Sequence, residues 1–193
     1  MAESNKTILR FEARRHRARM DIRTEGPLDA CDHFFTSIKP ETGQVIAAYW
    51  PHNKEFDSQP IIERLLEEGF QCALPVTQKD ARPLRFAKWR DDMDLKAGDH
   101  GALEPVVTAK TEWLEPDILI VPLLAFDRRG YRLGQGGGHY DATLKELRAK
   151  KNIVAVGLAY AQQACLFNLP VEEHDQKLDW VITPQGAQSF NVL

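Results

Sequence analysis

Three short apolar runs constrain the fold of this chain more than any other feature of its sequence. They cover residues 44–50, 117–126 and 152–160, and polar or turn-forming residues flank them. Strands that are covered on both faces of a parallel sheet read as continuous apolar runs of about this length. Segments with helical spacing alternate with these runs. The sequence therefore predicts a three-layer α/β fold, in which helices flank a mostly parallel sheet in a single domain over residues 1–193.

The remaining elements are predicted from hydrophobic periodicity and from turn residues. Helices are expected at residues 4–23, with Ser4 as the N-cap, and at residues 28–38, 60–68 and 139–150. Further strands are expected at residues 70–76, 83–89 and 178–183, the last of which ends the sheet. Residues 77–116 are rich in turn signals and predict a hairpin or an extended excursion.

Charge is unevenly distributed along the chain. The whole sequence has a net charge of −3, which argues against a general nucleic-acid binder, yet residues 1–23 alone carry +4. A basic segment on an acidic body suits an anionic ligand bound at one place. A solvated, arginine-rich helix is the alternative explanation of the same pattern.

Composition also bears on the compartment. No run approaches the roughly 18 apolar residues of a membrane span, and the N-terminus lacks the apolar core of a signal peptide. Three widely spaced cysteines, Cys31, Cys72 and Cys165, fit neither a disulfide framework nor a zinc site. We therefore expect reduced thiols and a cytoplasmic protein.

Residues 130–141, GYRLGQGGGHYD, are the most informative part of the chain. Glycine fills four of the five positions 134–138, and a helix is predicted to begin directly after them. A backbone without Cβ atoms can turn several N–H groups onto a phosphate, and the helix N-terminus and Arg132 add positive charge. A Walker loop and the dinucleotide pattern GxGxxG both fail at His139. We interpret the segment as a phosphate-binding loop of another design; a tight structural turn is the alternative.

Carboxylates near this loop predict a metal site. Asp141 falls in the first turn of the predicted helix, beside any bound phosphate, where Mg²⁺ is typically held by one or two carboxylates. An aspartate that only complements the helix dipole is the alternative. Spacing alone cannot choose the second carboxylate among Glu172, Glu173, Asp175 and Asp179.

Other candidate residues are weaker when taken alone. Lys6 and Arg10 lie four residues apart, hence on one face of the first helix, and could reach a polyphosphate. Trp50 and Glu55 follow a predicted strand and offer an aromatic wall beside a carboxylate, although ordinary packing explains Trp50 equally well. His139 has no second histidine at metal-ligand spacing, and no nucleophilic triad is recognisable.

At this point the residues resemble a known family. Phe126 and Asp127, followed by residues 130–141, closely resemble the signature of the 5-formyltetrahydrofolate cyclo-ligases, also called methenyltetrahydrofolate synthetases. The resemblance covers nearly the whole chain. It continues through residues 6–10, residues 48–51 with Glu55, residues 104–105 and 121–122, and residues 170–179, in the order of the family.

The resemblance implies a reaction in which ATP phosphorylates the formyl oxygen of 5-formyltetrahydrofolate, with or without a polyglutamate tail. Nitrogen-10 then closes the ring, and phosphate leaves to give 5,10-methenyltetrahydrofolate. It also implies a NagB/RpiA/CoA-transferase-like fold and a monomer that binds neither nucleic acid nor membrane. Phosphoryl transfer depends on positioning and charge neutralisation, which agrees with the absence of a triad.

The resemblance further implies a role for each matching position. Lys6 and Arg10 would bind ATP, and the residues wrapping its phosphates would be Arg132, Leu133, Gly134, Gln135, Gly136, Gly137, Gly138, His139 and Tyr140. Asp141 and Asp175 would hold Mg²⁺. Trp50 and Glu55 would contact the folate, and the catalytic set would be Arg132, His139 and Tyr140, the last two near the formyl group.

Two positions depart from the pattern of the family, and two other functions remain as alternatives. The family often has tyrosine where this chain has His139 and arginine where it has Ala142. One alternative is a catalytically diverged protein that holds nucleotide or folate for regulation. The other is an RNA-associated protein that uses the basic N-terminal helix.

Overall fold

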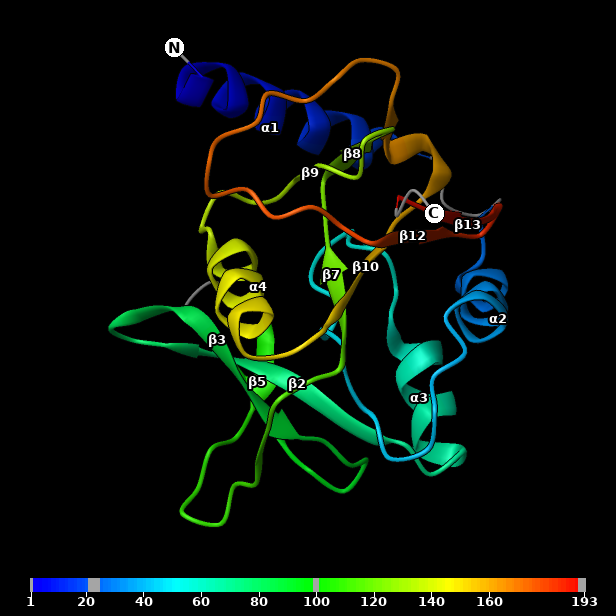
Figure 1. Ribbon diagram of the computed structural model, residues 1–193, viewed down its shortest axis with the longest axis vertical. Coiled ribbons are helices and arrows are strands. Elements are labelled where there is room, and N and C mark those ends of the chain that lie inside the picture. Colours follow the sequence, from blue (N-terminus) through cyan, green and yellow to red (C-terminus); the bar gives the residue numbers. More distant parts are fainter. Residues whose placement is uncertain (1, 21–24, 99–100, 191–193) are drawn as a thin grey trace.

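The computed structural model describes residues 2–20, 25–98 and 101–190, with side chains from residue 5 onward. These residues form an eight-stranded main sheet in the order β13-β12-β10-β7-β1-β2-β3-β6 (Figure 1). Its strands are β1 (Val45–Ala47), β2 (Gln71–Gln78), β3 (Ala81–Lys88), β6 (Trp113–Leu114), β7 (Ile118–Pro122), β10 (Val154–Leu158), β12 (Trp180–Thr183) and β13 (Gly186–Ser189).

The centre of this sheet is parallel and its edges are antiparallel. Strands β12, β10, β7, β1 and β2 run parallel to their neighbours in that order. At the edges, β13 pairs antiparallel with β12, and β3 and β6 extend the other side in antiparallel fashion. The predicted mostly parallel α/β sheet is confirmed in this mixed form. Strand β13 was missed, because its residues Gly186–Ser189 are polar and lie at an edge.

Helices cover both faces of the sheet and make three layers (Figure 1). Helices α2 (Pro27–Ser37) and α3 (Gln59–Glu67) lie on one face, and α4 (His139–Lys150) lies on the other. Side chains of β7 alternate between the two cores: Ile118 and Ile120 face α2 and α3, whereas Leu119 and Val121 face α4. This alternation explains why residues 118–121 are all apolar.

The predicted strand at residues 117–126 is wrong in one respect, because it divides into two strands of different sheets. Strand β7 ends at Pro122, which has no N–H to continue the ladder. Strand β8 (Ala125–Asp127) then pairs with β9 (Arg132–Leu133) and β11 (Ala164–Cys165) in a three-stranded sheet. Arg132 and Leu133 therefore belong to a strand, and the glycines follow a small hairpin instead of the central strand.

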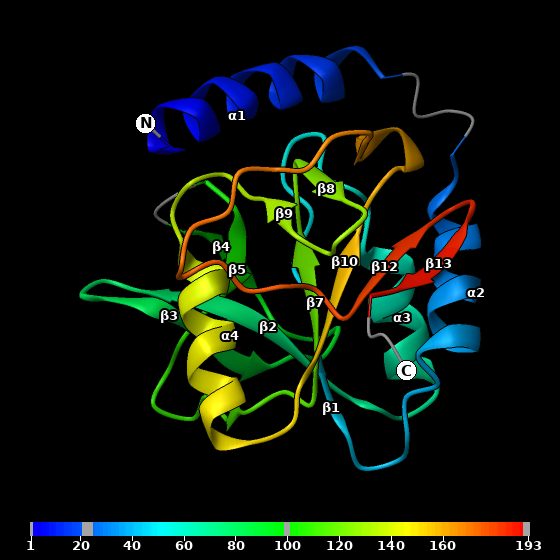
Figure 2. The same cartoon turned by 45° about the horizontal axis from the view of Figure 1, so that its top comes forward.

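Helix α1 (Ala2–Arg19) lies across this small sheet, at the top of Figure 2. Leu9 and Ala13 of α1 pack on a small cluster of Ala125, Leu133 and Leu169. Because the helix begins at Ala2, Ser4 lies inside it, and the N-cap prediction is wrong. The predicted extension over residues 21–24 lies outside the described residues. Among the described helices, none has both the length and the apolar composition that crossing a membrane requires.

The region that was hardest to predict forms two hairpins. Strands β2 and β3 pair antiparallel, as do β4 (Leu95–Ala97) and β5 (Leu103–Pro105). This outcome confirms the predicted strand at residues 83–89 and the expected hairpin. The cysteines are free: Cys31 and Cys72 are buried, and Cys165 is half-buried.

Gly130, in the turn between β8 and β9, is required by both conformation and space. Its φ is +85°, and a Cβ there would lie 2.8 Å from the Phe190 ring. We expect Gly130→Ala to lower the free energy of unfolding by about 3 kcal/mol, from left-handed strain plus overpacking. Gly43 is a matched control, because its φ is +93° but a Cβ there would meet no atom within 4 Å.

Urea denaturation of Gly130→Ala and Gly43→Ala measures how much unfolding free energy each variant loses. Gly43→Ala should cost only the conformational part, about 1–2 kcal/mol. Equal losses in the two variants would show that the contact with Phe190 contributes nothing.

Candidate active site

A row of cations on α1 faces the rest of the protein. Lys6, Arg10, Arg14 and Arg17 follow one another at helical spacing and so share one side of the helix. Beneath them lie the small sheet, the glycine segment and the loop that follows β11, seen in orange beside α1 in Figure 2. Part of the arginine-rich helix is therefore not a solvated face.

Lys6 binds two carboxylates from a distant part of the chain. Its Nζ donates to Oε2 of Glu172 and to Oδ2 of Asp175, each at 2.6 Å, and the residue is only 5% exposed. Burial lowers the pKa of the Lys6 ammonium, but the hydrogen bonds to Asp175 and Glu172 outweigh it, so the pKa is raised. Ligand atoms of Glu172, His174 and Asp175 all lie within 4.8 Å of one another.

Arg132 and Asp141, predicted as cation and acid of one site, are in direct contact. Nη2 of Arg132 donates to Oδ1 of Asp141 at 2.9 Å, and Nη1 donates to the Gln176 carbonyl at 2.6 Å. The Gln176 N–H donates to the same Asp141 oxygen at 2.9 Å. Burial lowers the pKa of the Arg132 guanidinium, while Asp141 and Asp175 oppose this shift. Both predicted acids are therefore near Arg132.

The glycine segment lies under the arginines of α1. Nε of Arg10 donates to the Gly134 carbonyl at 3.3 Å, and Nη2 of Arg14 donates to the Gln135 carbonyl at 2.9 Å. Gly136 has a φ of +112°, and a Cβ there would lie 3.5 Å from Nε of Arg10. Gly138, at a φ of +70°, is the N-cap of α4. The positive φ at Gly136 and Gly138 is the conformational reason for glycine at these two positions.

The side chains of His139 and Tyr140, the first two residues of α4, contact different parts of the structure. Nδ1 of His139 lies 2.8 Å from the Arg82 carbonyl, which can only accept, so Nδ1 carries a proton. His139 is thereby fixed to the β2–β3 hairpin. Tyr140 is half-buried against the core beneath α4. Burial raises the pKa of the Tyr140 hydroxyl, Glu55 adds to this shift, and Arg132 opposes it.

The loop after β1 carries the two residues predicted to contact a folate. Trp50 packs edge-on against Trp89, with ring centroids 5.7 Å apart, so a packing role is present whatever else it does. Oε2 of Glu55 accepts the His52 N–H at 3.1 Å. Burial raises the pKa of the Glu55 carboxyl, and His52, Arg17 and Gln135 hold it lower than burial alone would.

Asp127 has a structural role that sequence reasoning did not assign. It is fully buried, and its carboxylate accepts Nε and Nη2 of Arg129 at 2.9 and 2.7 Å. It also accepts the N–H groups of Arg129, Tyr131 and Leu169. An aspartate that precedes a turn and accepts the N–H two residues later is a known turn pattern. That pattern could have identified the residue.

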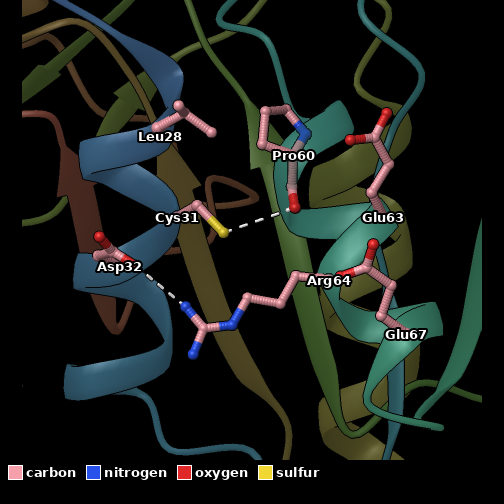
Figure 3. A pocket seen from close by; sticks show the side chains of 7 residues that line it. All are labelled: Leu28, Cys31, Asp32, Pro60, Glu63, Arg64 and Glu67. Carbon is pink, nitrogen blue, oxygen red and sulfur yellow. Dashed lines mark hydrogen bonds and ion pairs between the residues drawn. The ribbon is translucent and has the colours of Figure 1, made fainter.

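Two described cavities lie away from this site. One, of about 340 Å³, separates α2 from α3 and is lined by Leu28, Cys31, Asp32, Pro60, Glu63, Arg64 and Glu67 (Figure 3). Two of its side chains already donate hydrogen bonds within the cavity lining: Cys31 donates to the Pro60 backbone carbonyl, and Arg64 donates to the Asp32 carboxylate (Figure 3). The other, of about 490 Å³, lies between β3 and α4.

Two points remain about the site predictions: one concerns Leu133, and the other concerns three residues that the sequence reasoning did not assign to the site. Leu133 is buried in the small cluster under α1, and its role in ATP binding stays a prediction. Arg14, Arg17 and Glu172 touch the site but were not assigned to it. Helical spacing from Lys6 and Arg10 could have found the two arginines. No sequence signal separates Glu172 from the acidic residues around it.

Fold and site together define a class of protein: a three-layer α/β protein in which a basic helix, a glycine-rich segment and paired acids lie together. Comparison with known proteins then identifies the family. The family model described as 5-formyltetrahydrofolate cyclo-ligase family matches residues 2–184, and the chain belongs to this family.

Related proteins agree with this assignment. A 5-formyltetrahydrofolate cyclo-ligase of Mycolicibacterium smegmatis is 34% identical, with 83% of this chain and 84% of the relative covered. One of Haemophilus influenzae is 32% identical, with 88% and 92% covered. The structure of 5,10-methenyltetrahydrofolate synthetase from Aquifex aeolicus superimposes with a TM-score of 0.78 at 24% identity, over 97% of this chain and 94% of that one. The fold is therefore shared.

Proposed function

We propose that this chain catalyses the ATP-dependent cyclisation of 5-formyltetrahydrofolate to 5,10-methenyltetrahydrofolate, with release of ADP and phosphate. Membership of the family supports the reaction. One structural observation carries the proposal: Lys6, Arg10 and Arg132 gather with Asp141 and Asp175 around a glycine segment that begins a helix. Such a set of groups suits a polyphosphate with its metal ion.

The phosphates of ATP would bind between α1 and the start of α4. Residues 134–138 supply a backbone that can approach closely, and the N-terminus of α4 supplies its partial positive charge. Lys6 and Arg10 on α1, with Arg132 below, provide the full charges. Side chains so fixed do not have to reorganise as charge moves in the transition state.

Asp141 and Asp175 would hold Mg²⁺. Lys6 already places a cation 2.6 Å from an oxygen of Asp175, so this carboxylate is arranged to hold positive charge. Both hydrogen bonds that Asp141 accepts reach Oδ1. Oxygen ligands are those Mg²⁺ prefers, and the ion would neutralise charge on the phosphates. Lys6 would exchange its carboxylate partners for phosphate when nucleotide binds.

The chemistry needs two steps. The formyl oxygen attacks the γ-phosphorus, and the bond from that phosphorus to the bridging oxygen breaks, which releases ADP. Nitrogen-10 then attacks the formyl carbon and loses its proton, and the C–O bond breaks to release phosphate. Arg132 would stabilise the transferring group, and His139 and Tyr140 would lie near the formyl group. Trp50 and Glu55 would hold the pterin, as an aromatic face and a carboxylate can.

Four further properties belong to the same proposal. We infer a single domain, a monomer, a NagB/RpiA/CoA-transferase-like topology and a cytoplasmic location. The strand order of the main sheet, which has helices on both faces, supports the topology. The three cysteines are free, and a reducing compartment permits free thiols.

A spectrophotometric assay tests the function directly. Purified protein with Mg²⁺, ATP and 5-formyltetrahydrofolate should form the methenyl chromophore, and omission of ATP should abolish its formation. Binding of both ligands, measured by calorimetry, without any chromophore would instead indicate a diverged regulatory protein. Salt-sensitive RNA binding that survives Arg10→Ala and Asp141→Ala would favour the RNA-associated alternative.

A further inference from the structure

Arg17, near the end of α1, has a buried hydrogen-bond donor without a partner. The residue is 7% exposed, and its Nη1 has no hydrogen-bond partner among the residues that the structure describes. Buried polar groups nearly always have a hydrogen-bond partner, so an unpaired donor on a charged side chain requires an explanation. A bound ligand that supplies an acceptor is one such explanation.

The surroundings of Arg17 point to the folate side of the site. Burial lowers the pKa of the Arg17 guanidinium, while the nearby Glu55, Tyr49 and Tyr160 oppose this shift. Tyr49 belongs to the loop that carries Trp50 and Glu55, and the Phe56 ring in the same loop packs on the Tyr160 ring with centroids 4.6 Å apart. Arg17 therefore ends the cation row of α1 over this loop, whereas Lys6, Arg10 and Arg14 cover the phosphate side.

The chemistry of a pterin matches this arrangement. Along one edge, its 2-amino group and N3–H are donors, and the neighbouring 4-oxo oxygen is an acceptor. Glu55 as a carboxylate can accept from both donors, which leaves the 4-oxo oxygen in need of a donor beside Glu55. We propose that Arg17 is a further substrate-binding residue, whose Nη1 donates to this oxygen beside Glu55. The inference rests on the proposed function.

The electrostatics agree with this role. Burial raises the pKa of the Glu55 carboxyl, and Arg17 is one of the groups that oppose the shift. The other groups facing Glu55 are His52 in its own loop, Gln135 before α4, Tyr140 in α4 and Tyr49 after β1. Because a raised carboxyl pKa favours the protonated form, loss of Arg17 should shift the acidic limit of folate binding to higher pH.

Arg17→Met tests the inference, because methionine fills similar space without a donor or a charge. We expect the Kd for 5-formyltetrahydrofolate, measured by calorimetry without ATP, to rise about 10–100-fold. The KM for ATP should stay within about threefold, and the acidic limb of folate binding should move upward in pH. Since the variant removes an orphaned donor, its unfolding midpoint in urea should be unchanged or higher.

Two further variants complete the experiment. Arg17→Lys keeps the charge without the guanidinium fork, so it should weaken folate binding but retain the pH limit of the wild type. Arg15→Met is the matched control, because Arg15 lies on the exposed side of α1 beside Glu12. An unchanged folate Kd in Arg17→Met, or a lower unfolding midpoint together with an equal loss in Arg15→Met, would overturn the inference. Failure of the wild-type protein to form methenyl product would overturn the proposed function instead, since the Kd is measured without turnover.

Discussion

Asp141→Asn should lower the rate of methenyl formation by about 10³-fold, which corresponds to about 4 kcal/mol of transition-state stabilisation. Asparagine keeps an oxygen that can accept from Arg132 and from the Gln176 N–H, so local geometry should survive. What it removes is the negative charge that would hold Mg²⁺ against the phosphates. The Mg²⁺ concentration needed for half-maximal rate should therefore rise.

Glu146→Gln is the control for this prediction. Glu146 lies in the same helix α4, but its carboxylate is exposed and pairs with Lys150 at 2.9 Å. The rate of methenyl formation by Glu146→Gln should stay within about twofold of the wild-type rate, because exposed ion pairs contribute little to stability. Steady-state kinetics over a Mg²⁺ titration compare the two variants. Wild-type turnover by Asp141→Asn would exclude a metal role for Asp141 while leaving the reaction itself intact.

The central sheet could be predicted from sequence because burial on both faces leaves a strong signal. Residues 118–121 are apolar since each side chain enters one of two cores. Edge strands leave no such signal. Strand β13 is polar, and pairing with β12 depends on tertiary contact that composition does not reveal. The end of β7 could have been predicted from the position of Pro122, because proline lacks the N–H that continues a hydrogen-bond ladder.

The contacts of the candidate site likewise divide into those that the sequence could predict and those that it could not. Arg132 and Asp141 lie nine residues apart, and the glycine segment between them predicted their association, which the ion pair bears out. Lys6 meets Glu172 and Asp175 across more than 160 residues of sequence. No local pattern predicts which of several acids in an irregular loop reaches a lysine. The orphaned donor of Arg17 is likewise visible only once α1 lies on the loop after β1.

Asp127→Ala should lower the free energy of unfolding by about 3–5 kcal/mol, the largest stability effect that we expect from a single substitution here. The variant removes a fully buried carboxylate that accepts five hydrogen bonds. Three of the donors are backbone N–H groups, at Arg129, Tyr131 and Leu169, and the change leaves them without this acceptor. Urea denaturation followed by circular dichroism measures the change.

Asp92→Ala separates this effect from the loss of any acidic side chain. Asp92 is exposed and pairs with Arg90 at 3.0 Å, so its removal should cost less than about 0.5 kcal/mol. Asp127 also connects the β8–β9 turn to Leu169, while Arg132 follows Tyr131 directly along the chain. A displaced turn should therefore move Arg132 relative to Asp141, and the folded fraction of Asp127→Ala should bind ATP more weakly. A stable variant with unaltered ATP binding would mean that the glycine segment is held in place by α1 and α4 without this carboxylate.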